Sequence, residues 1–453
     1  MRYFSTRDVR SEWPTTLDTA LTAGLAPDGG LYVPEWLPRL TVEDFASCGT
    51  LPEVAERLLT PFFQGSSLAP HLREICREAL DLPLLLVGLK RSAESPSASA
   101  PDGAWLLELF HGPTAAFKDF AARFLAACLA RLRTADDPIR TVLVATSGDT
   151  GAAVAAAFHK RPGFRVVILY PHGRVSARQA HQLGAFGDNV YAFAVSGSFD
   201  DCQRMVKHAL GDRKFSSRQH LTSANSISLG RLLPQMGYYA YASLVLARGK
   251  PGAQSAAPEV IIPTGNLGNA LAAIMVREIG LPLGEIHLAS NANATLPEYF
   301  AGSPYRGRPS VPTLANAMDV GDPSNFERLA WFFKSRDLRH AGIQAHRVDD
   351  AAIRARIGEG IGKYWQVFCP HTACAVEVHE RLRAAGSPSV NLLVATAHPA
   401  KFNDIVDSLV GNPVAIPPAL EALLQRPARA EDLGATDQAL LARLERGFGS
   451  SHS

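Results

Sequence analysis

The chain has 453 residues, a formal net charge of +2 and a hydrophobic content of 47%. This length is enough for two or three packed domains with a large buried core. Acidic and basic residues are interspersed without a long basic run, which argues against nucleic-acid and membrane-surface partners and favours a small-molecule ligand. The N-terminus lacks an apolar signal core, and no stretch approaches roughly 18 consecutive apolar residues. We therefore expect a cytoplasmic protein.

Six cysteines are scattered along the chain without CxxC spacing. This sparseness favours free thiols in a reducing compartment over a disulfide framework. Cys369, His371 and Cys374 lie close together in the sequence, but the second half of a metal site is missing. We expect a buried thiol in a turn there, and no metal.

The N-terminal part of the chain differs in pattern from the rest. Residues 1–90 carry short helical patterns, such as Val54–Leu59, around a Pro- and Gly-rich turn at residues 26–34. Residues 92–103 are low in complexity, and both this stretch and residues 250–258 predict exposed loops.

Apolar β-rich runs then alternate with alanine-rich helical runs. The expected strands are residues 105–110, 141–145, 166–170, 190–195, 260–262 and 285–289. The expected helices are residues 119–132, 150–159, 177–183, 200–210 and 269–279. Continuously apolar strands that alternate with helices are typical of an α/β fold with parallel sheets covered on both faces. From Pro417 onward the pattern predicts terminal helices that fray after Gly447.

Lys118 lies between two phenylalanines at the expected start of a helix. The apolar residues that share its helical spacing, and should face a core, are Phe117, Phe120, Phe124 and Leu125. Thr114 is a candidate cap for the helix. An ammonium beside apolar surface has a lowered pKa and is prepared for Schiff-base chemistry. The alternative is a surface lysine whose aliphatic chain covers the rings while its amine contacts water. This segment alone favours the surface lysine, whereas the motifs described below favour the Schiff-base lysine.

A buried strand, a turn of small polar residues and a helix occupy residues 141–154. The residues at the start of the helix are Ser147, Gly148, Asp149, Thr150 and Gly151. Exposed N–H groups and the helix dipole favour an anion there, either a carboxylate or a phosphate. The alternative is an ordinary turn in which a Ser or Thr caps the helix.

Residues 260–271 repeat this arrangement. Gly265 and Gly268 allow a ligand to approach the backbone closely, and Asn266 and Asn269 add amide donors. The turn lacks the third glycine of GxGxxG, so a single phosphate is favoured over a dinucleotide. A glycine-bearing turn without a ligand is an equal alternative for this segment alone. One lysine and two anion-binding turns on an α/β scaffold indicate pyridoxal phosphate (PLP) and an anionic substrate.

Taken together, these segments resemble threonine synthase of the longer bacterial and fungal branch, in the fold type II class of PLP enzymes. The resemblance extends over residues 5–402, most of the chain. Its most specific blocks are residues 110–120, 146–151, 225–228 and 314–321. The phosphate turn usually reads Ser-Gly-Asn-Phe-Gly-Asp; here it is Thr-Gly-Asn-Leu-Gly-Asn at residues 264–269, which keeps the glycine spacing.

The resemblance implies a tryptophan synthase β-like fold, with two parallel-sheet lobes and a mainly helical N-terminal region. It implies an N-terminal region at residues 1–95. Residues 96–245 would form a lobe that carries the PLP lysine and the substrate-anion loop. In this fold class the lobe with the substrate-anion loop is the smaller of the two. Residues 246–453 would form a larger lobe with the cofactor-phosphate turn and the C-terminal helices. We expect a monomer or a homodimer.

The resemblance also implies the cofactor site. Lys118 would be the Schiff-base lysine and would then carry protons at Cα and Cβ. The turn that holds the cofactor phosphate would be Gly265, Asn266, Leu267, Gly268 and Asn269. Thr396, at the end of a buried strand, would place its hydroxyl against the pyridine nitrogen. The alternative is a hydroxyl bonded only to nearby backbone.

The substrate site is implied in the same way. The substrate carboxylate would lie on Ser147, Gly148, Asp149 and Thr150. The block that would recognise the substrate phosphate contains Asn225, Ser226 and Arg231, and the planar fork of an arginine can grip two phosphate oxygens. The alternative for Arg231 is an ordinary surface arginine. His111 and His398 receive no assigned role, because each either lines the site or is structural.

The implied reaction converts O-phospho-L-homoserine and water to L-threonine and phosphate, the last step of threonine biosynthesis. Phosphate would leave from Cγ by elimination, a proton would return at Cγ, and water would add at Cβ. One alternative is a related phospho-lyase or a serine/threonine dehydratase, and Asn225 with Arg231 favours a phosphorylated substrate over serine. A second alternative is a PLP-binding protein without turnover, against which the intact Lys118 environment argues.

Overall fold

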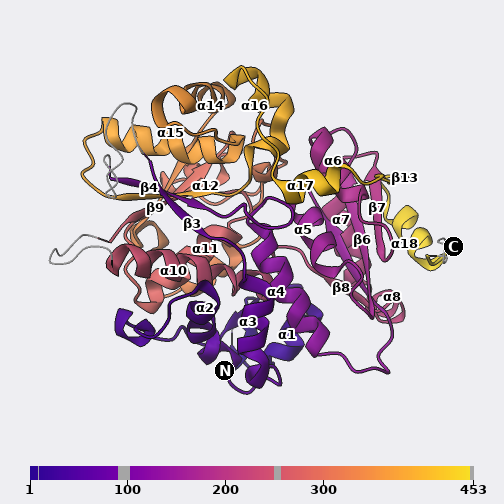
Figure 1. Cartoon of the computed structure of the whole chain (residues 1–453). Helices are drawn as coiled ribbons and strands as arrows, with labels where there is room; N and C mark the ends of the chain where they lie inside the picture. Colours follow the sequence, from indigo (N-terminus) through magenta and orange to yellow (C-terminus); the bar gives the residue numbers. More distant parts are fainter. Residues whose placement is uncertain (9, 90–102, 249–256, 449–453) are drawn as a thin grey trace.

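The computed structural model of the chain describes residues 1–8, 10–89, 103–248 and 257–448. They form two large, parallel-dominated sheets with helices on their faces, and a mainly helical N-terminal region lies against both (Figure 1). The α/β class expected from the sequence is therefore confirmed. The two loops expected at residues 92–103 and 250–258 fall almost wholly outside the described residues.

The N-terminal region combines short helices with a two-stranded antiparallel sheet. Its elements are β1 (Tyr3–Ser5), α1 (Leu17–Ala23), β2 (Tyr32–Pro34), α2 (Leu51–Leu59) and α3 (Leu72–Leu80). Helix α2 begins at a capping box in which the Glu53 carboxylate accepts from the Thr50 N–H at 3.0 Å. The apolar sides of α2 and α3 pack on α10 (Gln235–Arg248) and α4 (Lys118–Arg131), so this region belongs to the main core.

The six-stranded sheet has the order β11-β10-β9-β12-β4-β3, parallel except for β3 at its edge. Its strands are β3 (Leu85–Gly88), β4 (Ala104–Glu108), β9 (Glu259–Pro263), β10 (Ile286–Ser290), β11 (Ile343–Arg347) and β12 (Asn391–Ala395). Its faces are covered by α11 (Gly268–Ile279) and α15 (Pro370–Ala384). Val260 and Ile262 belong to one core and Ile261 to another, as a strand buried on both faces requires.

The five-stranded sheet has the order β13-β7-β6-β5-β8 and is parallel throughout. Its strands are β5 (Arg140–Ala145), β6 (Phe164–Pro171), β7 (Val190–Val195), β8 (Leu221–Ser223) and β13 (Glu431–Leu433). The helices that lie between residues 149 and 232 in the sequence are α5 (Asp149–Phe158), α6 (Ala177–Gly184), α7 (Phe199–Gly211), α8 (Arg213–Arg218) and α9 (Leu229–Leu232). The other α-helices in the described ranges are α12 (Thr295–Phe300), α13 (Phe326–Phe332), α14 (Asp350–Tyr364), α16 (Asn403–Val410), α17 (Pro418–Leu424) and α18 (Asp437–Glu445).

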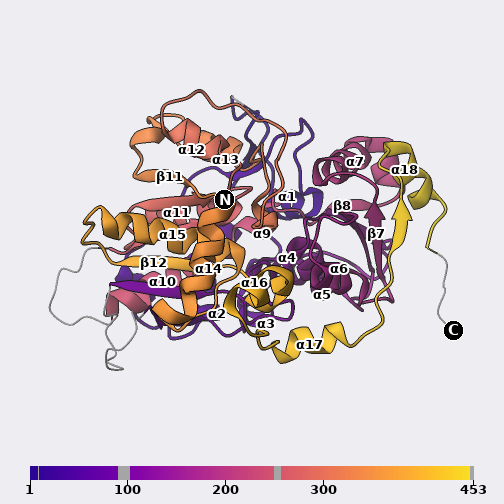
Figure 2. The ribbon, with the colours of Figure 1, turned by 90° about the horizontal axis from the view of Figure 1, so that it is seen from above.

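The C-terminal tail differs from the expectation of helices alone. Helices α17 and α18 are present, but the chain forms β13 between them and pairs it with β7. The tail thus passes from the six-stranded sheet to the outer edge of the other sheet (Figure 2). Local pattern did not predict β13, because its three residues include two acids and one leucine.

The strands and helices expected between residues 105 and 289 are present with ends shifted by two residues or fewer. The sheets draw strands from several parts of the sequence: β4 joins the sheet of β9 to β12, and β13 joins the sheet of β5 to β8. The domain boundaries at residues 95 and 245 remain a proposal. None of the helices within the described ranges has the length and hydrophobicity that a membrane crossing requires.

Candidate active site

A cavity of about 120 Å³ lies beyond the carboxyl ends of β5, β9 and β12. In parallel α/β sheets this is the edge at which ligands bind. The cavity is lined by every residue expected to bind the cofactor or the substrate except Gly148. These residues are Lys118, Ser147, Asp149, Thr150, Asn225, Ser226, Arg231, Gly265, Asn266, Leu267, Gly268, Asn269 and Thr396. The fold thus gathers segments that are far apart in the sequence.

Lys118 is the first residue of α4 and lies partly buried at the cavity. Its Nζ is 5.4 Å from the centre of the Phe117 ring. Phe120 and Phe124 are fully buried, as expected, but Phe117 is only partly buried and lines the cavity. The reason is that α4 begins one residue after Phe117, so this ring stands outside the helix and beside the lysine.

The expectation that Thr114 caps α4 is wrong. The N-cap position is Phe117, whose side chain makes no capping hydrogen bond, and Thr114 lies three residues earlier. The Thr114 hydroxyl instead donates to Asp119 at 2.6 Å, and its N–H donates to the same carboxylate at 2.8 Å. This pair fixes the turn that leads into Lys118.

The environment of Lys118 favours its free amine. Burial lowers the pKa of Lys118 to about 8; Asp149 opposes this shift, whereas Arg231 and Lys401 add to it. The lysine therefore holds much more free amine near neutral pH than a surface lysine does, as covalent chemistry with a carbonyl requires.

The turn between β9 and α11 is shaped for close approach to its backbone. Leu267, which precedes α11, has a φ of 64°, in the left-handed region. A Cβ on Gly265 would come within 2.7 Å of the Met318 Cα, so only glycine fits there. The Asn266 amide donates to Ser226 at 2.6 Å and links this turn to the Asn225 block.

Arg231 is a buried cation, and the residues that the structure describes give it no ion-pair partner. Only 2% of the residue is exposed, and Nη1 donates to the Ala224 carbonyl at 2.7 Å, while Nε has no hydrogen-bond partner. Among the described residues, no carboxylate oxygen lies within 4.0 Å of its guanidinium. Burial lowers the pKa of Arg231 to about 10, which leaves it charged at neutral pH.

The surface-arginine alternative is therefore wrong. A buried, unpaired charge is costly unless an anion meets it. The buried Oδ1 of Asn225 also lacks a partner, so the two residues leave polar atoms available beside the same cavity.

The loop at residues 147–150 is held by an ion pair that the sequence did not predict. Asp149, the first residue of α5, lies 2.7 Å from the Nζ of Lys401 and accepts from the Gln179 amide at 3.0 Å. Burial alone would raise the pKa of Asp149, but Lys401 and then Lys118 outweigh it and hold the pKa below its ordinary value. Asp149 is therefore ionised. Lys401 is fully buried and also donates to the Thr114 carbonyl at 2.8 Å.

Sequence reasoning did not assign Gln179 to the site, and it considered His371 only as a metal ligand. The side chain of Gln179 reaches from α6 to Asp149 and accepts from the Asn316 amide at 3.0 Å. A Cβ on Gly148, whose φ is 125°, would meet Gln179 at 2.6 Å. His371 lines the cavity and accepts from the Ala317 N–H at 3.1 Å; burial lowers its pKa to about 4, so it is neutral. No local motif signals either residue, because their partners are distant in the chain.

His111 and His398 lie outside the cavity lining. His111 Nε2 is 2.7 Å from the Glu108 carboxylate. His398 precedes a short 3₁₀ turn, and its Nδ1 accepts from the Ala400 N–H at 3.2 Å. Both contacts support structural roles for these histidines.

All six cysteines are buried and free, which confirms the expectation of free thiols. Cys369 caps α15, where its sulfur accepts from the Thr372 N–H at 3.4 Å, and Cys374 donates to the Pro370 carbonyl at 3.5 Å. Both thiols are buried, as expected, but neither lies in an isolated turn: Cys369 is the N-cap of α15 and Cys374 lies within that helix.

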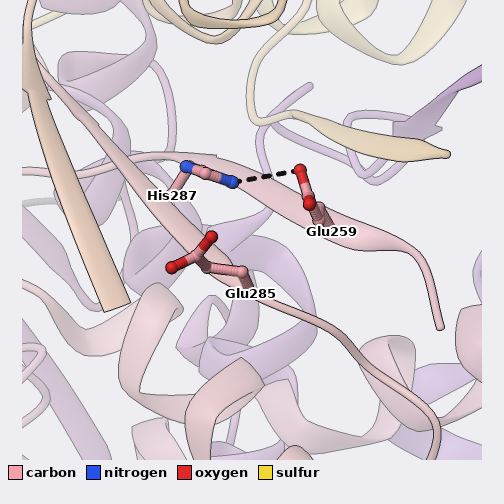
Figure 3. Close-up of side chains that lie close together, drawn as sticks. All are labelled: Glu259, Glu285 and His287. Atoms are coloured by element: carbon pink, nitrogen blue, oxygen red, sulfur yellow. Dashed lines mark hydrogen bonds and ion pairs between the residues drawn. The ribbon is translucent and has the colours of Figure 1, made fainter. Parts of the chain in front are cut away.

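Figure 3 shows a separate cluster of Glu259, Glu285 and His287 at the amino ends of β9 and β10. Their ligand-type atoms lie within 4.8 Å of one another. His287 Nε2 is 3.2 Å from Glu259 and Nδ1 is 3.1 Å from His346, so both ring nitrogens have protein partners. The cluster lies away from the cavity lining, and the expectation of no metal remains a prediction.

Three family models match the chain in succession. The model described as "Threonine synthase N terminus" matches residues 2–80, "Pyridoxal-phosphate dependent enzyme" matches residues 90–396, and "Threonine synthase, C-terminal" matches residues 372–444. The threonine synthase of Pseudomonas aeruginosa is 34% identical over 460 residues, covering 95% of this chain and 95% of that protein. The chain belongs to the threonine synthase family. It is accordingly a PLP-dependent enzyme.

Solved structures of threonine synthases show the same fold. The Escherichia coli structure has a TM-score of 0.87 at 32% identity and covers 99% of this chain and 100% of that one. A PLP-bound threonine synthase from Brucella melitensis has a TM-score of 0.84 at 32% identity and covers 98% and 99%. The expected fold type II architecture and the longer bacterial and fungal type are thus confirmed.

The residues that line the cavity fit PLP. Lys118 supplies a partly buried amine with a lowered pKa, and the backbone at Gly265 has no side chain where a phosphate would approach. Asn269 accepts from the Tyr239 hydroxyl at 3.0 Å, while its buried Nδ2 has no partner. We propose that Lys118 bonds to the cofactor, that the turn from Gly265 to Asn269 holds its phosphate, and that Thr396 contacts its ring nitrogen.

Borohydride reduction of the PLP-loaded protein should fix the cofactor on Lys118. Two other lysines lie near the cavity, but Lys401 is engaged by Asp149 and Lys207 is exposed at the rim. Digestion and peptide mapping should therefore find one pyridoxyl adduct, on Lys118. An adduct on Lys207 or Lys401 would reject the assignment.

Reconstitution of the PLP-free protein should depend on pH with a midpoint near 8. The free amine is the nucleophile, and burial sets the pKa of Lys118 to about 8. The rate of cofactor incorporation, followed by absorbance under excess PLP, should rise with pH below that value and level off above it. A midpoint near the ordinary lysine value of roughly 10.4 would show that the amine is not desolvated as described.

Thr396→Ala should weaken catalysis more than folding. Thr396 is 5% exposed and follows β12, and its carbonyl accepts from the Phe117 N–H at 2.8 Å, which places it next to the lysine segment. Loss of one neutral hydrogen bond should cost about 0.5–1.5 kcal/mol in the activation barrier. Thr396→Ser keeps the hydroxyl and is the matched control. Unchanged kcat and an unchanged cofactor spectrum in Thr396→Ala would reject this role.

Proposed function

We propose that the chain acts as a threonine synthase that converts O-phospho-L-homoserine and water to L-threonine and phosphate. The observation that carries the proposal is the buried, unpaired guanidinium of Arg231 on the same cavity as Lys118. A PLP enzyme that acts on serine needs no such second cationic site, because the turn from Gly265 to Asn269 already serves the cofactor phosphate. A phosphorylated amino acid supplies the missing anion.

Different residues of the protein transfer protons and bind the substrate phosphate. Bound PLP supplies an electron sink when the substrate loses protons. Lys118 carries protons to and from Cα and Cβ, since its lowered pKa allows both protonation states near neutral pH. Arg231, Asn225 and Ser226 hold the phosphate as its bond to Cγ breaks.

The loop at residues 147–150 holds the substrate carboxylate at the start of α5, where the helix dipole favours an anion. The Lys401–Asp149 pair fixes the end of this loop, so the N–H groups of Ser147 and Thr150 keep one orientation. Such preorganisation positions the reacting bond and limits the entry of water.

We also propose a cellular compartment, a class of binding partner and an oligomeric state for the enzyme. Buried free thiols suit a reducing, cytoplasmic compartment. The partner is the small-molecule substrate rather than nucleic acid or a membrane, which suits the small net charge of +2. A monomer or a homodimer remains our expectation for the oligomeric state.

The test is incubation of the purified, PLP-loaded protein with O-phospho-L-homoserine, with threonine, phosphate and 2-oxo acid quantified together. We expect equal amounts of threonine and phosphate and no 2-oxo acid. Phosphate with a 2-oxo acid would indicate a phospho-lyase, and turnover of serine or threonine alone would indicate a dehydratase. A stable PLP spectrum without any product would indicate a binding protein.

A further inference from the structure

One side of α7 lines the cavity, although nothing in the sequence assigned it a role. Phe199, Gln203 and Lys207 are spaced four residues apart and therefore share one helix face, which we call the α7 face. Each of the three lines the cavity. Gln203 is partly buried and Lys207 is exposed, so the α7 face adds an amide and an amine to the cavity lining.

The other sides of α7 are already occupied. Cys202, Met205 and Val206 are fully buried in the core of the five-stranded sheet. Arg204 pairs with Asp437 of α18, and His208 lies 3.5 Å from the same carboxylate. Arg204 and His208 thus stabilise the contact between α7 and α18.

Lys207 differs from Arg204 and His208. In the part of the chain that the structure describes, no carboxylate oxygen lies within 4.0 Å of its amine. The side chain is exposed, unlike that of Arg231, so the cavity has a buried cation on the inside and an exposed one on its rim.

The charges around the cavity leave room for a doubly charged anion. The lining cations are Lys118, Lys207 and Arg231, and the lining acid is Asp149, whose charge is balanced by Lys401. A phosphate monoester carries about −1.5 to −2 charges at neutral pH. Arg231 alone balances one of them, and a second cation within reach would balance the other.

We propose that Lys207, assisted by the amide of Gln203, is a second contact for the substrate phosphate and forms the outer wall of its subsite. This inference rests on the proposed function. A lysine is a compact charge on a flexible stem, so it suits a rim position where phosphate enters with the substrate and leaves as product. Phe199 covers the same wall with apolar surface and limits the access of water.

The test compares Lys207→Gln with wild type in the PLP-loaded enzyme. We expect KM for O-phospho-L-homoserine to rise roughly tenfold, equivalent to about 1.4 kcal/mol, while kcat changes by less than about threefold. Competitive inhibition by inorganic phosphate should weaken by a similar factor. Both effects should shrink as ionic strength rises, because the contact lies at an exposed rim.

Lys214→Gln is the matched control, since it removes the same charge from the neighbouring helix α8 at an exposed position off the cavity. It should leave KM and phosphate inhibition unchanged, and Lys207→Arg should restore most of the lost affinity. PLP content and melting temperature should be the same in all variants.

The outcomes separate the two claims. If wild type forms threonine but Lys207→Gln matches it in KM and in phosphate inhibition, the role of Lys207 is overturned and the proposed function stands. If wild type forms no threonine from O-phospho-L-homoserine, the proposed function fails and this inference fails with it.

Discussion

Replacing Lys118 by alanine should abolish turnover while the chain remains folded. The amine both holds the cofactor and carries protons, and loss of a proton-transferring group alone costs roughly 10²- to 10⁴-fold in rate. Folding should be unaffected, because burial already disfavours the charged amine and the fully buried Phe120 and Phe124 stay in place. Alanine is also the best helix former at an α-helical position.

The measurement is threonine formation by Lys118→Ala, together with its circular dichroism and melting temperature. Lys214→Ala is the matched control, because it removes an exposed lysine from α8 without touching the cavity. Turnover within tenfold of wild type would show that another group carries the chemistry.

Arg231→Ala should lower kcat/KM strongly. Truncating one member of a buried charge pair costs about 2–5 kcal/mol, here the pair between the guanidinium and the substrate phosphate. That corresponds to a loss of roughly 30- to several-thousand-fold in kcat/KM. Because Arg231 also holds the leaving group during elimination, kcat should fall along with any rise in KM.

The Arg231 variants also separate the two phosphate sites. PLP content should stay near wild type in Arg231→Ala, since the turn from Gly265 to Asn269 serves the cofactor. Arg231→Lys should restore activity only in part, because a point charge cannot reproduce the guanidinium fork. If Arg231→Ala loses PLP but processes O-phospho-L-homoserine normally with excess cofactor, the two phosphate sites have been exchanged.

Regular elements were predictable because local pattern determines them. The strand β7 and the helix α6 follow apolar runs with turn residues at their ends, and both lie where the sequence places them. Strand β13 was not predictable, because its pairing with β7 depends on where the tail passes and not on its own three residues. The same limit explains why the N-cap of α4 was misplaced: the turn is set by Thr114 bonding to Asp119.

In the site, too, residues in local motifs could be predicted, whereas contacts between distant segments could not. Residues in short motifs, such as Gly265 and Arg231, could be found because the motif itself carries the resemblance. The ion pair between Lys401 and Asp149 joins two segments that only the folded chain brings together. Lys207 lies outside any motif, and its position on the cavity follows only from the packing of α7.

Turnover in ¹⁸O-labelled water tests the proposed carbon–oxygen cleavage most directly. If phosphate leaves from Cγ with its bridging oxygen and water then adds at Cβ, the label should enter the hydroxyl of threonine. The released phosphate should carry no solvent oxygen. Mass spectrometry of both products after limited turnover measures this. Labelled phosphate together with unlabelled homoserine would show cleavage of the phosphorus–oxygen bond, and would contradict a threonine synthase reaction at this site.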